Sequence, residues 1–190
     1  MAFVEQIKDS ELFERDRAAL GYVPNFARLF AHRPAVYEAW LGLRDAILAS
    51  MDTRRYELAT VAAARELRSS YCTLVHGKVL ADRFLGPAQV RDMIVDHRSA
   101  GLDEIDVAVM DLAEKVARDA TSVTEADVQR LRDLGLSDAE ILDVVAAAAA
   151  RCFFSKTLDG LGVQADPAYA ELDPELRDVL TVGRPIAESA

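Results

Sequence analysis

The chain has 190 residues, of which 51% are hydrophobic, so it is long and apolar enough to form one domain around a sizeable core. It carries 22 Lys and Arg against 32 Asp and Glu, and a net charge of −10 argues against binding to nucleic-acid phosphates. Two cysteines make no disulfide framework, the charged N-terminal segment has no apolar signal-peptide core, and no apolar run approaches the roughly 20 residues of a membrane helix. Together these features indicate a soluble cytoplasmic protein.

The first half of the chain carries start and stop signals for three helices. Pro34 occupies a first-turn position, and apolar residues then recur at helical spacing: Val36, Trp40, Leu43 and Ile47. A second helix is expected from about Thr53 to Leu67, and a third from Ser69 or Ser70 to Phe84, where Gly and Pro follow at 86 and 87.

The second half continues the helical pattern. After a short helix in "GPAQVRDMIVDH", a stripe of apolar residues marks a longer one: Ile105, Val109, Leu112 and Val116. Capping boxes follow at Thr124 with Asp127 and at Ser137 with Glu140, and the second opens a long helix that Gly160 is expected to close. Five alanines at 146–150 in that helix predict a neighbour packed very close to it.

No segment reads as a strand of any length. The sequence therefore predicts an all-α fold of about seven to nine helices. We expect a single domain over residues 1–190, with an N-terminal helical segment at 1–33, a helical core at 34–166 and a C-terminal tail at 167–190.

The stretch "YELATVAAARELRSSYCTLVHGKVL" at 56–80 places Glu57, Cys72 and His76 among alanine and aliphatic residues. One unbroken helix would hold Glu57 and His76 about 30 Å apart. The two serines offer a break, because serine is favoured at helix N-caps. With Ser69 as the N-cap, two antiparallel helices would bring Glu57 back toward His76 and put Cys72 in a first turn.

Such a break permits chemistry at the thiol. The positive end of the helix dipole stabilises a thiolate in the first turn, His76 lies four residues on to take its proton, and Glu57 can orient the imidazole. The structural alternative stays open, because a free cysteine commonly packs as a small hydrophobe and a glutamate near a helix start commonly serves the dipole.

The spacing of Glu57, Ser69, Cys72 and His76 resembles the motif of the alkylhydroperoxidase D-like family, within the carboxymuconolactone decarboxylase superfamily. That motif is Glu, eleven residues, then Cys-x-x-Cys-x-x-x-His. Two flanking segments, "LGYVPNFARLFAHRPAVYEAW" and "VTEADVQRLRDLGLSDAEILDVV", resemble the peroxidase-related branch of the family, so the resemblance runs from about residue 12 to about residue 166.

The resemblance implies an all-helical homo-oligomer, a trimer or hexamer, that reduces small hydroperoxides without a cofactor. Cys72 would attack the peroxide, and Glu57 and His76 would move protons. Ser69 stands where the family has its resolving cysteine, so a sulfenic acid at Cys72 would need another thiol, either Cys152 or an external reductant of unknown identity.

Two other classes of function remain. A cofactor-free lyase or decarboxylase would use His76 as general acid–base on a small organic acid, with a carboxylate-binding arginine for which Arg28, Arg54 and Arg55 are candidates. A non-catalytic oligomeric member of the family would keep only the fold.

The remaining candidates carry less information. His32 and His97 have no matched partners in the sequence, so no metal site is expected. Trp40, Phe153 and Phe154 are expected in the core or in an interface. Tyr71 would either line the pocket or pack, and the sequence leaves that open.

Overall fold

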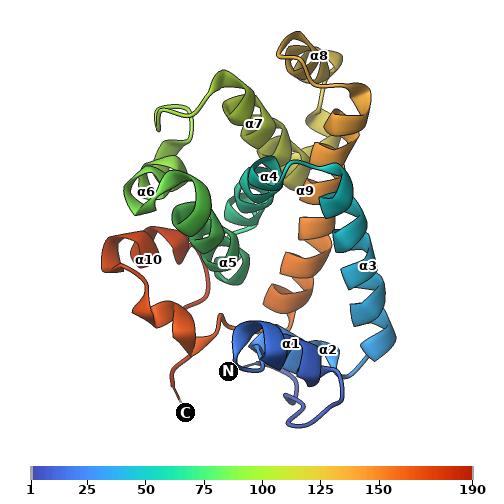
Figure 1. The fold of residues 1–190 in the computed structure, drawn as a ribbon, viewed down its shortest axis with the longest axis vertical. Helices are drawn as coiled ribbons and strands as arrows, with labels where there is room; N and C mark the ends of the chain where they lie inside the picture. Colours follow the sequence, from blue (N-terminus) through green and yellow to red (C-terminus); the bar gives the residue numbers. More distant parts are fainter. Residues whose placement is uncertain (1, 190) are drawn as a thin grey trace.

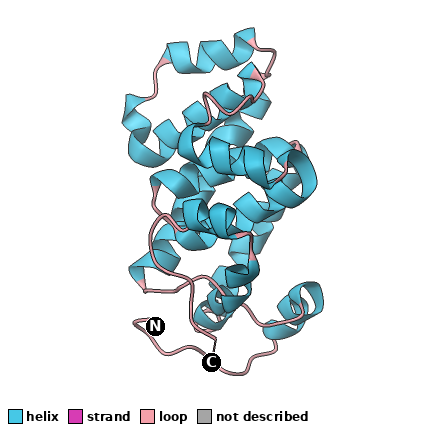
Figure 2. Cartoon of the chain, turned by 90° about the vertical axis from the view of Figure 1, so that its left-hand side faces the viewer, coloured by secondary structure: helices cyan, strands magenta, loops and turns pink. Residues whose placement is uncertain are grey.

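The computed structural model describes residues 2–189, and this range contains only helices and the loops between them (Figure 2). Ten α-helices follow one another along the chain: α1 Phe13–Leu20, α2 Asn25–Phe30, α3 Pro34–Ser50, α4 Thr53–Glu66, α5 Ser70–Leu80, α6 Pro87–Asp96, α7 Glu104–Asp119, α8 Glu125–Asp133, α9 Asp138–Gly160 and α10 Pro174–Leu180. The predicted all-α class is confirmed, with slightly more helices than expected. None of the helices in the described range is both long enough and apolar enough to cross a bilayer.

Helix α4 lies in the middle of the fold, packed against α5, α7 and α9 (Figure 1). Every residue from Tyr56 to Ala64 is buried, so α4 has no solvent face along this stretch. A helix that is apolar or small on all sides belongs inside a protein, which explains the alanine-rich sequence of this segment. Its single buried carboxylate, Glu57, therefore stands out.

The alanine run of α9 faces α4 and α7 in part. Ala147, Ala148 and Ala150 are buried, whereas Ala149 is exposed. Helix α9 packs against both α4 and α7, as the small side chains predict. Both predicted capping boxes are present. Helix α9 ends at Gly160 as predicted, although the left-handed residue is Gly162, with φ 72°, and not Gly160 itself.

The break between α4 and α5 is confirmed. Arg68 adopts a left-handed φ of 55° and Ser69 an extended conformation before α5 begins at Ser70. The expected capping hydrogen bond of Ser69 is wrong, because its hydroxyl does not bond the α5 backbone. That hydroxyl lies toward Asp159 in α9 without reaching hydrogen-bond geometry.

The C-terminal segment packs against α5 and forms hydrogen bonds with its first turns. Helix α10, inside the segment expected as a tail, packs against α5 and α6. The hydroxyl of Thr73 donates to the carbonyl of Leu180 at 2.5 Å, and the backbone amide of Gly183 donates to the Ser70 hydroxyl at 2.8 Å. Residues 174–183 therefore hold the start of the helix that carries Cys72 and His76.

Candidate active site

Glu57 and His76 form a buried pair across the break. Oε2 of Glu57 lies 2.6 Å from Nδ1 of His76, although the two residues are 19 apart in sequence. An unbroken helix would separate them by about 30 Å. The turn at residues 67–69 thus brings together two of the predicted site residues.

Cys72 occupies the third position of α5 and is only 1% exposed. Its sulfur accepts hydrogen bonds from Oγ of Ser155 at 3.1 Å and from Nη1 of Arg151 at 3.4 Å. These two residues are four apart on α9, so they project from one face of that helix. Within the described residues His76 makes no hydrogen bond to the sulfur, and proton transfer from Cys72 to His76 stays a prediction.

Arg151 is a guanidinium buried without a carboxylate partner in the described range, with 4% of the residue exposed. It lies over the rings of Trp40 and Phe154, with 5.6 and 5.4 Å to the centroids, and donates to the Tyr56 hydroxyl at 3.5 Å. Burial lowers the pKa of Arg151, but the Cys72 sulfur and the Tyr56 hydroxyl outweigh it and leave that pKa raised. The side chain therefore keeps its positive charge beside the thiol.

A small cavity of about 120 Å³ opens onto Cys72. Its apolar wall consists of Val75 and four aromatic residues: Phe26, Trp40, Tyr71 and Phe154. Its polar groups are Arg44, Cys72, His76 and Arg151, and the wall contains no carboxylate. Trp40 and Phe154 therefore line a site as well as the core. Tyr71, which the sequence left undecided, also lines the cavity and donates its hydroxyl hydrogen to Asp166.

The surroundings of the His76 imidazole favour its neutral form. Burial and then the charge of Arg151 lower its pKa, and the Glu57 carboxylate only partly opposes them. With Glu57 accepting from Nδ1, that nitrogen carries the proton of the neutral ring, and Nε2 is left as an acceptor. Nε2 has no hydrogen-bond partner in the described part of the chain.

Cys152 is badly placed to resolve Cys72. It follows Arg151 directly, so its side chain is rotated by about 100° from the helix face that carries Arg151 and Ser155. It is half-buried and forms no part of the cavity wall, and burial raises the pKa of its thiol.

The three arginines proposed from the sequence as carboxylate binders lie elsewhere. Arg28 donates to the carbonyl of Ile7, Arg54 pairs with Asp106 at 2.6 Å, and Arg55 pairs with Glu140 at 3.3 Å. The arginines at the cavity are Arg44 and Arg151, which sequence reasoning missed. Arg151 did leave a signal there, as the one basic residue in an apolar stretch of α9.

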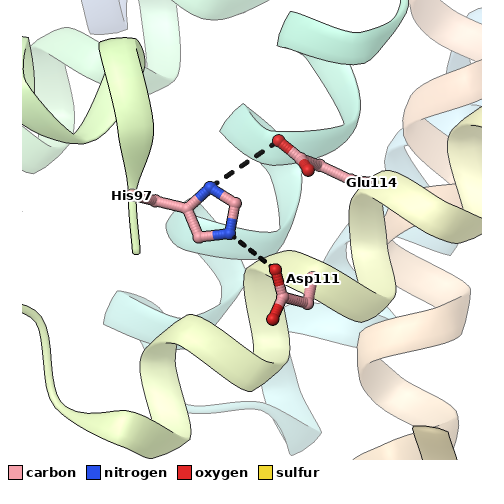
Figure 3. Close-up of side chains that lie close together, drawn as sticks. All are labelled: His97, Asp111 and Glu114. Carbon is pink, nitrogen blue, oxygen red and sulfur yellow. Dashed lines mark hydrogen bonds and ion pairs between the residues drawn. The ribbon is translucent and has the colours of Figure 1, made fainter. Parts of the chain in front are cut away.

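His97 has partners after all, which corrects the sequence-based expectation. It is fully buried, its Nε2 lies 2.9 Å from Asp111, and its Nδ1 lies 3.7 Å from Glu114 (Figure 3). The imidazole of His32, in contrast, has its one hydrogen bond among the described residues with the backbone carbonyl of Glu5.

The three side chains of the His97 cluster have the composition of a metal site. Three guanidinium groups already pair with its two carboxylates: Arg65, Arg98 and Arg130. A divalent cation would have to displace this positive charge, so the cluster fits an ion-pair network that ties α4, α7 and α8 to the residues directly after α6.

The chain matches no protein-family profile and no curated protein. Its fold is similar to that of a peroxidase-related protein from Ralstonia eutropha JMP134 with an alkylhydroperoxidase AhpD core (23% identity, TM-score 0.75, 90% of this chain and 88% of that one). It is also similar to a peroxidase-related protein from Silicibacter sp. TM1040 (20% identity, TM-score 0.80, 90% of this chain and 94% of that one). A third similar structure is a cysteine-to-alanine variant of the debrominase Bmp8 in complex with 2,3,4-tribromopyrrole (14% identity, TM-score 0.75, 95% of this chain and 98% of that one). The chain has the alkylhydroperoxidase D-like fold.

Proposed function

We propose that the protein is a thiol-dependent oxidoreductase in which Cys72 reduces small hydroperoxides. One observation carries the proposal: the Cys72 sulfur, bonded by Arg151 and Ser155, shares a small aromatic cavity with His76, whose ring Glu57 orients. A packed structural cysteine needs neither a charged donor nor a cavity.

The first step makes the nucleophile. Neutral His76 takes the proton of the Cys72 thiol through the ligand or solvent between them, because the two side chains share the cavity without a direct hydrogen bond. The thiolate then stays beside the Arg151 guanidinium, and Glu57 stabilises the imidazolium.

The second step breaks the peroxide. The sulfur attacks the terminal oxygen, an S–O bond forms as the O–O bond breaks, and the leaving alkoxide takes the proton from His76. The products are an alcohol and a sulfenic acid at Cys72.

The third step needs a reductant from outside the site. Ser69 has no thiol, and Cys152 does not line the cavity that holds Cys72. An external low-molecular-weight thiol would displace water from the sulfenic acid to form a mixed disulfide. A second thiol would release that disulfide and restore Cys72. Assembly into a homo-oligomer remains a prediction.

Sulfenic-acid trapping tests the proposal. Reduced protein receives one equivalent of hydroperoxide with a trapping reagent, and intact mass follows the adduct. We expect fast trapping in the parent and in Cys152→Ser, none at position 72 in Cys72→Ser, and slow trapping in His76→Ala. Labelling no faster than that of a free thiol would refute the proposal. Turnover of a small organic acid that survives Cys72→Ser would favour the lyase instead.

Reductive dehalogenation is a second candidate, supported by the similarity to the Bmp8 structure and by the aromatic cavity wall. The thiolate would attack bromine on an aromatic ring, so that an S–Br bond forms and the C–Br bond breaks. The ring carbon would take a proton from His76, and two external thiols would reduce the sulfenyl bromide with loss of bromide. Bromide release from a brominated pyrrole under the same conditions tests this candidate.

A further inference from the structure

Arg44 brings to the cavity wall a charge that the proposed reaction does not use. It stands on α3 one turn after Trp40, and both side chains line the cavity. Among the described residues, its Nε and Nη2 pair only with the neighbouring Asp45, at 2.8 and 2.7 Å. Asp45 is 61% exposed and is not part of the cavity wall.

The positive charge of Arg44 acts on His76, which also lines the cavity. After burial, Arg151 and the opposing Glu57, it is among the groups that act on the pKa of His76, which it helps to lower. The wall thus holds two guanidinium groups and no carboxylate. A Cys72 thiolate neutralises Arg151 and leaves Arg44 with its exposed partner.

An acid group entering the cavity would compete well for Arg44. Exposed ion pairs such as Arg44 with Asp45 are weak because water screens them. A carboxylate held against the aromatic wall would be screened less and can accept two hydrogen bonds from the guanidinium. At about 120 Å³ the cavity is close in size to an engineered cavity of about 150 Å³ that holds benzene.

We infer that the site selects compact, mainly apolar hydroperoxides that carry a carboxylate, with Arg44 binding the carboxylate while Cys72 attacks the peroxide. The hydroperoxide part of this inference rests on the proposed function, whereas the preference for an anion does not. Arg44 is then the residue of the cavity wall that determines specificity.

Two alkylating reagents of nearly equal size test the preference without peroxide chemistry. Iodoacetate and iodoacetamide attack the same thiolate but differ in charge. In a Cys152→Ser background, their rate ratio at Cys72 in the folded protein is compared with the ratio in denaturant. We expect folding to raise the iodoacetate-to-iodoacetamide ratio by about 3- to 10-fold.

Matched variants locate the effect. Arg44→Gln should abolish the rise and Arg44→Lys should keep most of it. Arg132→Gln is the control, because Arg132 also pairs with an exposed aspartate, Asp138, and its side chain is 39% exposed against 38% for Arg44, yet it lies on α8 outside the cavity. A ratio that Arg44→Gln leaves unchanged, or a Cys72 that reacts with neither reagent, overturns the inference.

A pair of hydroperoxides separates this inference from the proposed function. tert-Butyl hydroperoxide and 3-hydroperoxy-3-methylbutanoate differ by one carboxylate, and the second should oxidise Cys72 faster in an Arg44-dependent way. Equal rates would reject the inference and leave the peroxidase standing. Two inert hydroperoxides together with a preserved alkylation ratio would reject the peroxidase and leave an anion-selective cavity.

Discussion

Gly183→Ala should loosen the helix that carries Cys72, because the C-terminal segment passes too close to the α4–α5 break to admit a side chain. A Cβ at position 183 would lie 2.0 Å from the carbonyl oxygen of Arg68, which is backbone and cannot rotate away. The segment must shift, and the bond from the Gly183 amide to the Ser70 hydroxyl would be lost with it.

The magnitude follows from these two terms. Overpacking costs about 1 to 3 kcal/mol, and the lost hydrogen bond adds about 1 kcal/mol. We therefore expect the free energy of unfolding to fall by about 2 to 4 kcal/mol, measured by urea denaturation. Alkylation of Cys72, which is almost fully buried in the parent, should become faster.

Two further substitutions should raise the free energy of unfolding instead of lowering it. Gly42→Ala, at an exposed position of α3 with nothing within 4 Å of the added Cβ, should stabilise by about 0.5 to 1 kcal/mol. Arg68→Gly should stabilise the protein by about 1 kcal/mol, because glycine adopts the left-handed φ of 55° without strain. The loss of the exposed hydrogen bond from Arg68 to the Val182 carbonyl offsets part of this gain. A Gly183→Ala protein as stable as the parent, with Cys72 equally protected, would contradict the role assigned to the C-terminal segment.

Three other outcomes follow from the site and the His97 cluster. Because burial and Arg151 lower the pKa of His76, the neutral base persists below its usual value of about 6.5. In stopped-flow measurements, the rate of Cys72 oxidation should therefore fall with acidification only below about pH 6.5. This fall should move to higher pH in Arg151→Met, and a fall above about pH 6.5 in the parent would contradict the reasoning. Burial raises the pKa of Asp111, but bonds from its basic neighbours outweigh it and leave the pKa lowered, so its stabilisation is present above about pH 4 and disappears as pH falls through the folded value. Asp111→Asn should cost about 1 to 3 kcal/mol at about pH 7 by denaturation, with a gap to the parent that narrows in acid; a gap independent of pH would count against the network. Ser69→Cys should let peroxide form a disulfide with Cys72, seen as the loss of two hydrogens in intact mass, and an unchanged mass would show that the two positions cannot bridge.

Much of the fold was predictable because its signals are local. The capping boxes at Thr124 and Ser137 join residues three apart, and the break at Arg68 and Ser69 interrupts an otherwise continuous helical pattern. The pairing of Glu57 with His76 followed from that break, since antiparallel helices of the lengths predicted bring the two positions level. The predicted capping hydrogen bond of the Ser69 hydroxyl was wrong, because tertiary packing directs this hydroxyl toward α9.

The environment of the thiol depended on tertiary packing. Ser155 and Arg151 reach Cys72 from a helix far along the chain, with sequence separations of 83 and 79, and no spacing rule links them. The same holds for Arg44 on α3. The amino-acid pattern alone therefore predicts most of the helices, because hydrogen bonds within a few residues define a helix, and it singles out Glu57, Cys72 and His76 as candidates for a site. The charges that surround the sulfur could not be read from that pattern, because long-range packing of α3, α5 and α9 creates those contacts.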